Sequence, residues 1–244
     1  MIPKVIHYCW FGRNPLPKLA EKCIDSWKHF FPGYEIKEWN EDNFDVNIIP
    51  YTKEAYEAKK YAYVSDYARF WILYNYGGLY FDTDVEVIKP LDDIIAAGPF
   101  MGCEKDYADL GRWPDVNPGV GLGISSGHPL IKELLDIYQT LSYYEENKNG
   151  TFKTIVDYTT ELLAKHGLEA KNGIQKVDGV FVYPKDFFNP LEHINQLHIT
   201  DNTRSIHFFA GTWIGKKDRM KRKIANLLGA KLYGFILKNI KKVK

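Results

Sequence analysis

The chain has 244 residues, of which 45% are hydrophobic and 26% charged, with a formal net charge of +1. This is the composition of an ordinary globular chain, large enough for one large α/β domain or two small ones. No apolar run reaches the length of a membrane span, and we expect no signal peptide at the N-terminus. The three cysteines lack the spacing of metal ligands, so we expect reduced core residues in a cytoplasmic protein.

The net charge hides an uneven distribution along the chain. Residues 216–244 hold eleven Lys or Arg and one Asp, a charge of +10, which leaves −9 for residues 1–215. We expect a body over residues 1–215 and a basic, amphipathic helical tail over residues 216–244. An acidic body with a basic tail argues against a nucleic-acid partner. The tail either packs its apolar stripe on the body or lies on an anionic membrane surface, and both interpretations stay open.

The first third of the chain alternates strands and helices. Residues 5–10 predict an opening strand, residues 17–30 a helix, and residues 34–39 a second strand. Helices are predicted over residues 52–76, and the part from 61 to 76 is apolar nearly all round, which indicates a buried helix. Such alternation favours an α/β fold with a mostly parallel central sheet and helices on its faces.

The later elements are less regular. A buried strand is predicted over residues 79–87, after the helix stop Gly77-Gly78. Residues 103–127 are rich in glycine and predict a long loop that leads into a strand. The remaining predictions are helices over 128–144 and 151–166 and strands over 177–184 and 205–209.

Three polar or aromatic residues follow the first predicted strands. Trp10, Asn40 and Asp82 each come at the carboxyl end of one of them. In parallel α/β sheets, ligands bind beyond the carboxyl ends of the strands. We therefore expect these residues at one ligand-binding edge.

Asp82 and Asp84 are spaced i, i+2 at the end of an apolar run. Two carboxylates so placed can converge on one hard divalent cation, Mg²⁺ or Mn²⁺, which leaves coordination positions for the phosphates of a substrate. The alternative is a solvated turn with two exposed aspartates, because Asp-x-Asp alone is a common sequence.

Asp66 and Arg69 interrupt the apolar helix predicted over residues 61–76. They are spaced i, i+3 and so share one face of that helix. A buried aspartate and arginine must be paired or bound to something. Either they form a structural ion pair, or Arg69 binds a phosphate and Asp66 a ribose or sugar hydroxyl.

Four groups of residues together form a more specific signal than any one of them. They are Ile2-Pro3-Lys4-Val5-Ile6-His7, Trp10, Ser65-Asp66 with Arg69, and the run Tyr74, Gly77-Gly78, Tyr80, Asp82, Asp84. The pattern resembles glycosyltransferase family 32, the DxD-motif sugar transferases of capsular polysaccharide synthesis type, which are related to the glucosylating domains of the large clostridial toxins. The resemblance is strongest over residues 1–90. It implies a GT-A fold, a nucleotide-sugar donor, a Mn²⁺ or Mg²⁺ ion and transfer with retained anomeric configuration.

The resemblance also implies roles for residues that would bind the donor. Trp10 matches the aromatic residue that stacks on the nucleobase, and Tyr80 matches a tyrosine near the diphosphate. Asp66 and Arg69 match the helix pair that contacts the ribose or donor sugar and the phosphate. Asp82 matches a carboxylate shared between sugar hydroxyls and the metal.

Further roles concern the metal and the sugar. Asp84 matches the direct metal ligand, and His207 is placed where many GT-A enzymes have a C-terminal metal ligand. Trp213 resembles an aromatic residue that closes over the diphosphate. The loop over residues 103–127 would shape the sugar and acceptor pocket, with Asn117 as a sugar contact.

The sequence thus predicts a metal-dependent retaining glycosyltransferase. Its donor would be a UDP-sugar, although guanine would also stack on Trp10, and its acceptor a saccharide or lipid-linked saccharide in bacterial capsule or surface polysaccharide synthesis. We expect a cytoplasmic enzyme held at the inner face of the membrane by residues 216–244. The alternatives are a phosphatase-like hydrolase with an aspartate nucleophile, and a catalytically inactive sugar-binding module.

Overall fold

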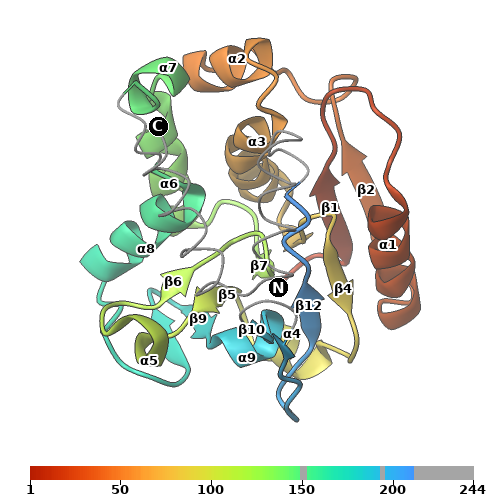
Figure 1. Ribbon diagram of the computed structural model, residues 1–244, viewed down its shortest axis with the longest axis vertical. Coiled ribbons are helices and arrows are strands. Elements are labelled where there is room, and N and C mark those ends of the chain that lie inside the picture. Colours follow the sequence, from red (N-terminus) through yellow and green to blue (C-terminus); the bar gives the residue numbers. More distant parts are fainter. Residues whose placement is uncertain (149–152, 193–195, 212–244) are drawn as a thin grey trace, which may run out of the picture.

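A mixed β-sheet with helices on both faces forms the body of the protein (Figure 1). The computed structural model describes residues 1–148, 153–192 and 196–211. The strands of the main sheet lie in the order β2 (Glu35–Trp39), β1 (Val5–Cys9), β3 (Gly78–Tyr80), β7 (Leu122–Ile124), β5 (Phe100–Lys105), β9 (Val180–Tyr183) and β8 (Gln175–Val177), and β6 (Asp115–Val116) pairs with β5. Two small antiparallel sheets join β4 (Val85–Val87) to β12 (Ser205–His207) and β10 (Leu191–Glu192) to β11 (Gln196–Leu197).

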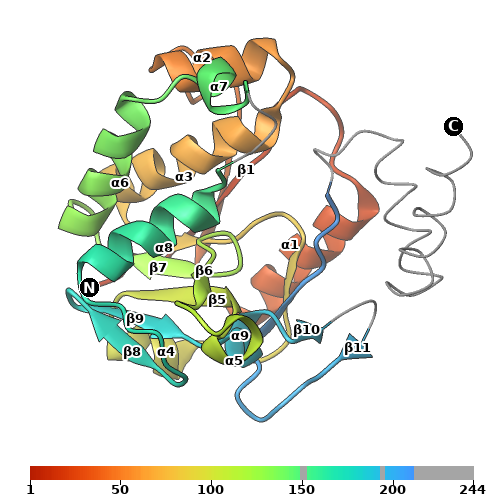
Figure 2. The ribbon, with the colours of Figure 1, turned by 60° about the vertical axis from the view of Figure 1, so that its left-hand side comes forward.

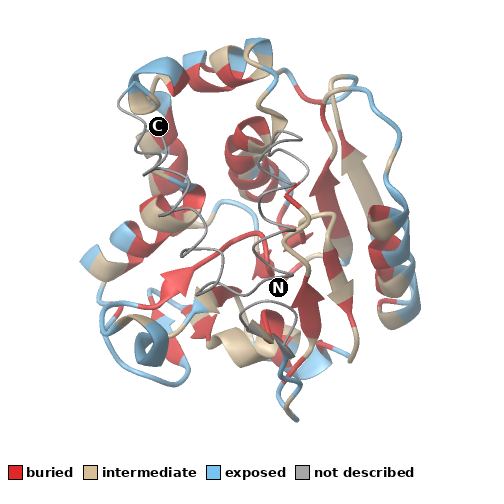
Figure 3. Cartoon of the chain, viewed as in Figure 1, coloured by how far each residue is buried: buried red, intermediate tan, exposed pale blue. Residues whose placement is uncertain are grey.

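The helices enclose two hydrophobic cores, one on each face of the sheet (Figure 2). One face is covered by α2 (Pro50–Glu57), α3 (Tyr61–Tyr76), α6 (Pro129–Gln139), α7 (Tyr143–Glu146) and α8 (Ile155–Lys165). The other face is covered by α1 (Lys18–Phe30), α4 (Asp92–Ala97) and α9 (Lys185–Phe188); the remaining short helix is α5 (Tyr107–Leu110). Figure 3 shows that the central strands and the inner sides of the helices are buried, whereas the edge strand β2 is mostly of intermediate burial and the outer sides of the peripheral helices are exposed. The result is a three-layer α/β fold.

The predicted early elements are confirmed. The strand, helix and strand expected over residues 5–39 are β1, α1 and β2. The helix from Tyr61 to Tyr76 is α3, and it is buried along most of its length. Gly77 ends it with a φ of 64°, and its N–H still donates to the carbonyl of Leu73 at 2.9 Å. An added Cβ would lie 2.7 Å from the backbone nitrogen of Ser126, so glycine is required here.

The predicted α/β sheet is confirmed, but its strands are mixed rather than mostly parallel. β1 pairs in parallel with β2 and β3, as the strand–helix alternation indicates. β7 runs antiparallel to both of its neighbours, β3 and β5. The glycine-rich stretch before β7 contains no long helix that could carry the chain back for another parallel crossover.

Several later predictions are corrected in detail. The single strand predicted over residues 79–87 is two short strands, β3 and β4, because a tight turn closes between them with Val85 N–H bonded to the carbonyl of Asp82 at 3.0 Å. The sequence did not predict β5, and the strand predicted over 177–184 is a hairpin, β8–β9. Asp178 and Gly179 form its turn with φ values of 45° and 86°, as hairpin turns of two residues require.

Other predictions lie partly or wholly outside the described residues. Trp213 and the tail over residues 216–244 are among these, so the tail stays a sequence-based hypothesis. Within the described part, Cys9, Cys23 and Cys103 are free and buried, as predicted. No described helix combines the length and the apolar character needed to cross a membrane.

Candidate active site

A cleft of about 930 Å³ opens where β1 and β3 end. Seven of the nine predicted site residues line it: Trp10, Asp66, Arg69, Asp82, Asp84, Asn117 and His207. The expectation of a site beyond the carboxyl ends of the strands is met for Trp10 and Asp82. Asn40 instead lines a smaller hollow of about 290 Å³ on another side of Trp10.

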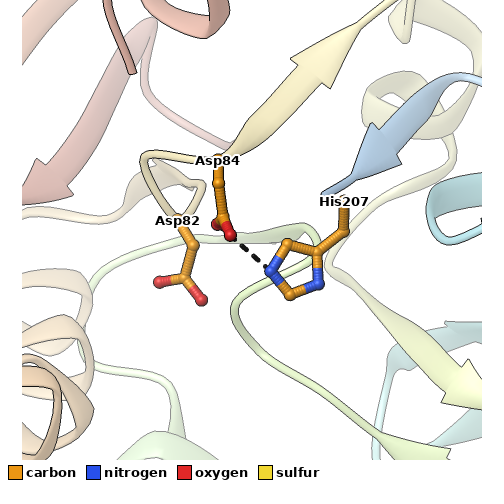
Figure 4. Close-up of side chains that lie close together, drawn as sticks. All are labelled: Asp82, Asp84 and His207. Carbon is orange, nitrogen blue, oxygen red and sulfur yellow. Dashed lines mark ion pairs between the residues drawn. The ribbon is translucent and has the colours of Figure 1, made fainter. Parts of the chain in front are cut away.

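Asp82, Asp84 and His207 converge at one point of this cleft (Figure 4). One ligand atom from each lies within 4.8 Å of the others. The two aspartates project from the turn between β3 and β4. His207 ends β12, whose antiparallel pairing with β4 sets it opposite Val85, next to Asp84. Its Nε2 lies 3.1 Å from Asp84 Oδ1.

The surroundings of Asp84 hold it as an anion. Burial alone would raise the pKa of Asp84, but the charge and hydrogen bond of His207, together with the N–H of Ala210, lower it below its usual value. The Ala210 N–H donates to Asp84 Oδ2 at 2.7 Å. Burial opposes the charge on His207 as well, yet the neighbouring Asp84 raises the pKa of this histidine. Asp84 and His207 therefore each favour the charged form of the other.

The cluster fits a divalent cation. Two carboxylates and one imidazole provide the oxygen and nitrogen atoms that Mn²⁺ accepts, and the carboxylates suit Mg²⁺. His207 binds a cation only as neutral imidazole, so the ion has to displace the proton that Asp84 stabilises. The prediction that Asp82 and Asp84 share a metal site, rather than forming a solvated turn, is supported by this convergence.

Arg69 joins the metal cluster to α3. Its Nη2 lies 3.0 Å from Asp66 Oδ1 and 3.2 Å from Asp82 Oδ1. Its guanidinium also lies over the ring of Tyr80, 4.7 Å from the centroid. Arg69 is only 3% exposed, and its Nη1 is buried without a hydrogen-bond partner. One donor of this arginine is therefore left for a ligand.

The ion pair considered from the sequence exists, but it lines the cleft. Burial raises the pKa of Asp66 to about 7, while Arg69 acts in the opposite direction and Asp82 adds to the increase. Arg69 itself lines the cleft, and a fully satisfied structural pair would leave none of its guanidinium nitrogens without a partner. Tyr80 differs from its predicted place, because it is 1% exposed and does not line the cleft. It supports Arg69 from behind.

The stretch from Asn117 to Gly119 closes against the metal cluster. The carbonyl of Gly119 accepts a hydrogen bond from the N–H of Asp82 at 2.9 Å, and Asn117 Oδ1 accepts one from the N–H of Gly119 at 2.7 Å. A Cβ on Gly119 would lie 2.0 Å from Asp82 Oδ2 and 2.8 Å from Arg69 Nη1. Sequence reasoning named Asn117 but missed Gly119, although it singled out the glycine-rich stretch that contains both.

Gly119→Ala is expected to weaken Mn²⁺ binding by about 10- to 100-fold, as losses of supporting contacts at metal sites do. The added methyl group meets the Asp82 carboxylate and forces it to move. Titration of Mn²⁺ by electron paramagnetic resonance measures the effect. Gly121→Ala is the matched control, because a Cβ there meets the ring of Phe188 at 3.0 Å and not the cluster. Equal affinity of Gly119→Ala and the unaltered protein would contradict the assignment.

Trp10 provides an aromatic wall at one end of the cleft. Its indole N–H donates to the carbonyl of Asn14 at 2.6 Å, and its backbone N–H donates to the carbonyl of Trp39 at 2.8 Å. Phe11, the next residue, also lines the cleft, as does Tyr61, whose ring lies against Gly12. The ring is thus held by two hydrogen bonds in a position where a flat ligand can stack.

The opposite wall consists of residues that the sequence analysis did not single out. Asp115 is 7% exposed and pairs with Arg112 at 2.8 Å and with Lys105 at 3.6 Å. Glu104, on β5, lines the cleft beside Asn117. No spacing in the sequence indicates this wall, because the pairing of β5 with β6 and β7 assembles it.

Comparison with known proteins supports the resemblance over part of the chain. Residues 17–101 match the family model of the glycosyltransferase sugar-binding region containing DXD motif. This span contains Asp66, Arg69, Asp82 and Asp84, and it excludes Trp10, Asn117 and His207. The resemblance to DxD-motif sugar transferases is thereby supported, while the capsular subtype stays a hypothesis.

Two curated relatives extend the similarity. The uncharacterized glycosyltransferase L373 of Acanthamoeba polyphaga mimivirus is 28% identical over 198 residues, which cover 78% of this chain and 76% of that protein. Inositol phosphoceramide mannosyltransferase 3 of Schizosaccharomyces pombe is 28% identical over 167 residues. That match covers 65% of this chain but 42% of the yeast protein, so the chain spans less than half of that relative.

Among solved structures, the PaToxG glycosyltransferase superposes with a TM-score of 0.50 at 19% identity, over 67% of this chain and 69% of that one. The fold is of the GT-A type. At this identity the likeness establishes the fold alone, and the predicted fold class is confirmed. In this fold, the turn that carries Asp82 and Asp84 lines the cleft at the carboxyl ends of the parallel strands β1 and β3.

Proposed function

We propose that the protein is a metal-dependent glycosyltransferase that moves a sugar from a nucleotide-sugar donor to a saccharide acceptor. The observation that carries this proposal is the convergence of Asp82, Asp84 and His207 beside the partly unsatisfied Arg69 in one cleft. The match of residues 17–101 to a DXD sugar-binding region and the names of the relatives support it.

Arg69 has the central electrostatic role in this proposal. Breaking the bond between sugar and phosphate leaves negative charge on the departing diphosphate. Arg69, which is buried and has an unpartnered Nη1, would donate a hydrogen bond to it. Asp82, Asp84 and His207 would hold Mn²⁺ or Mg²⁺, which, when bound, supplies further positive charge for the diphosphate.

The other end of the cleft would bind the nucleoside. Trp10 offers its ring face for stacking, and Asp66, 9% exposed, offers a carboxylate oxygen to a ribose or sugar hydroxyl. We propose uracil as the base. Guanine would stack as well. Because the relative from Schizosaccharomyces pombe is named a mannosyltransferase, GDP-mannose is the second donor to test.

We propose that transfer retains the anomeric configuration of the donor. In this mechanism the acceptor hydroxyl attacks on the face from which the diphosphate departs, and its proton passes to a phosphate oxygen. We expect proton NMR of the first-formed product to display the anomer of the donor. The opposite anomer would refute both the mechanism and the placement among retaining transferases.

The acceptor is proposed to be a saccharide or lipid-linked saccharide, as in the synthesis of a bacterial capsule or surface polysaccharide. The relatives of Schizosaccharomyces pombe carry names that describe transfer to inositol phosphoceramide, a lipid, so lipid-linked acceptors deserve equal weight. The further proposal that residues 216–244 hold the enzyme at the inner face of a membrane rests on the sequence alone.

A panel of nucleotide-sugars with and without Mn²⁺ tests the function. UDP-glucose, UDP-galactose, UDP-N-acetylglucosamine and GDP-mannose are each added with Mn²⁺ or with EDTA. We expect one of them to raise the unfolding temperature, since a ligand at a hundred times its Kd adds about 2.7 kcal/mol. We also expect slow hydrolysis to the nucleoside diphosphate, and both effects should vanish in EDTA. Binding without hydrolysis would indicate an inactive sugar-binding module, and release of inorganic phosphate would indicate a phosphatase.

A further inference from the structure

Glu104 is held rigidly at the wall of the cleft that faces Asn117. It is the last residue but one of β5 (Phe100–Lys105). Its backbone carbonyl accepts a hydrogen bond from Asn189 Nδ2 at 2.9 Å, and its Oε2 accepts one from Asn117 Nδ2 at 2.9 Å. Both the main chain and the side chain of Glu104 are therefore fixed.

A continuous series of hydrogen bonds connects Glu104 to the metal cluster. Asn117 donates to Glu104 and accepts from the N–H of Gly119 at 2.7 Å. The carbonyl of Gly119 in turn accepts from the N–H of Asp82 at 2.9 Å. The position of the Glu104 carboxylate is thus coupled to that of Asp82, and Glu104 also acts electrostatically on His207.

Glu104 differs from the other carboxylates of the cleft in its partners. Four of them pair with basic side chains: Asp66, Asp82, Asp84 and Asp115. Asp157 accepts both the N–H and the hydroxyl of Thr154 at the start of α8. Within the described residues, Glu104 is bonded only to a neutral amide, and its Oε1 has no protein partner.

The chemistry of the Glu104 carboxylate limits which ligand groups its free Oε1 can bind. A carboxylate repels phosphate, and an ionised one accepts hydrogen bonds but donates none. A hydroxyl group is the matching donor. In a nucleotide-sugar, the sugar is attached directly to the diphosphate. The hydrogen-bond series runs from Asp82, on the proposed diphosphate side of the cleft, to Glu104, so Glu104 lies on the side where the sugar would be.

We propose that Glu104 binds a hydroxyl group of the donor's sugar and thereby selects which sugar is transferred. This inference rests on the proposed function of the same cleft. Glu104 acts in binding, and Asn117 is the positioning residue that orients its carboxylate.

Isothermal titration calorimetry in Mn²⁺ tests this role. Each protein is titrated with the best-binding nucleotide-sugar of the panel above and, separately, with the corresponding nucleoside diphosphate. Glu104→Gln keeps an oxygen for Asn117 but removes the charged acceptor. We expect it to bind the nucleotide-sugar about 10- to 100-fold more weakly, the effect of losing a hydrogen bond to a charged group. Its affinity for the nucleoside diphosphate should be unchanged, and Asp157→Asn, the matched control, should change neither affinity.

Monodeoxy analogues of the donor sugar identify the contact directly. One deoxy analogue should bind the unaltered protein as weakly as the full donor binds Glu104→Gln. The variant should bind this analogue and the full donor with equal affinity, because the substitution and the missing hydroxyl remove the same interaction. An unchanged preference of Glu104→Gln for the nucleotide-sugar, or the absence of any such coupled analogue, would overturn the inference. If the unaltered protein binds neither nucleoside diphosphate nor nucleotide-sugar, the proposed function itself fails.

Discussion

Asp84→Asn is expected to lower metal-dependent turnover by about 10²- to 10³-fold while the protein stays folded, the scale of losing one preorganised electrostatic group. The substitution keeps the size of the side chain and an oxygen for the N–H of Ala210, which now donates to Asp84 Oδ2 at 2.7 Å. It removes the charge that would hold the cation together with Asp82 and His207. Hydrolysis of the nucleotide-sugar at increasing Mn²⁺ concentrations measures the loss.

The matched control for this variant is Asp93→Asn. Asp93 also pairs with a cation, Arg204 at 2.9 Å, and its pKa is likewise lowered, by a hydrogen bond from that arginine, but it lies outside the cleft. We expect Asp93→Asn to retain full activity. If Asp84→Asn were as active as the unaltered protein, both in Mn²⁺ and in EDTA, Asp84 would not belong to the metal site.

Arg69→Ala is expected to destabilise the fold by about 3–5 kcal/mol at neutral pH, the cost of removing one partner of a buried ion pair. It leaves Asp66 and Asp82 close together without their shared cation. Burial already raises the pKa of Asp66 to about 7, and without Arg69, which lowers it, the pKa rises further. Asp66 takes up its proton near pH 7 in the unaltered protein and at higher pH in Arg69→Ala, so the destabilisation should shrink as the pH falls from 9 to 7 and stay constant below that. Urea unfolding across this range measures it.

A second variant separates the two roles of Arg69. Asp66→Leu/Arg69→Leu removes both charges, and hydrophobic replacement of a buried pair is often neutral for stability. We expect this double variant to be folded and to have lost turnover, because it lacks the Nη1 that we propose as a hydrogen-bond donor to the diphosphate. A folded and fully active double variant would mean that the pair is structural.

The candidate site residues that the sequence analysis rightly placed next to one another are those within a single element. Asp66 and Arg69 lie on one face of α3 because of the helical period, and Asp82 and Asp84 lie in one turn. Even within a single element, the sequence pattern did not predict the orientation of every side chain. Tyr80, in the short strand β3, faces Arg69 rather than the cleft, and alternation along a strand does not say which face is buried against which neighbour.

By itself, the sequence determined the α/β class, the boundaries of the early strands and helices, and the spacing of Asp82 and Asp84 after a buried strand, since periodicity, glycine stops and carboxylate spacing are local properties. The tertiary structure alone decided that His207 meets Asp84, because the pairing of β12 with β4 joins segments far apart in the chain. It also decided that Gly119 touches Asp82, that β7 runs antiparallel, and that Glu104 faces the cleft. These contacts depend on which distant segments bury their apolar faces together, and no short-range spacing encodes that choice.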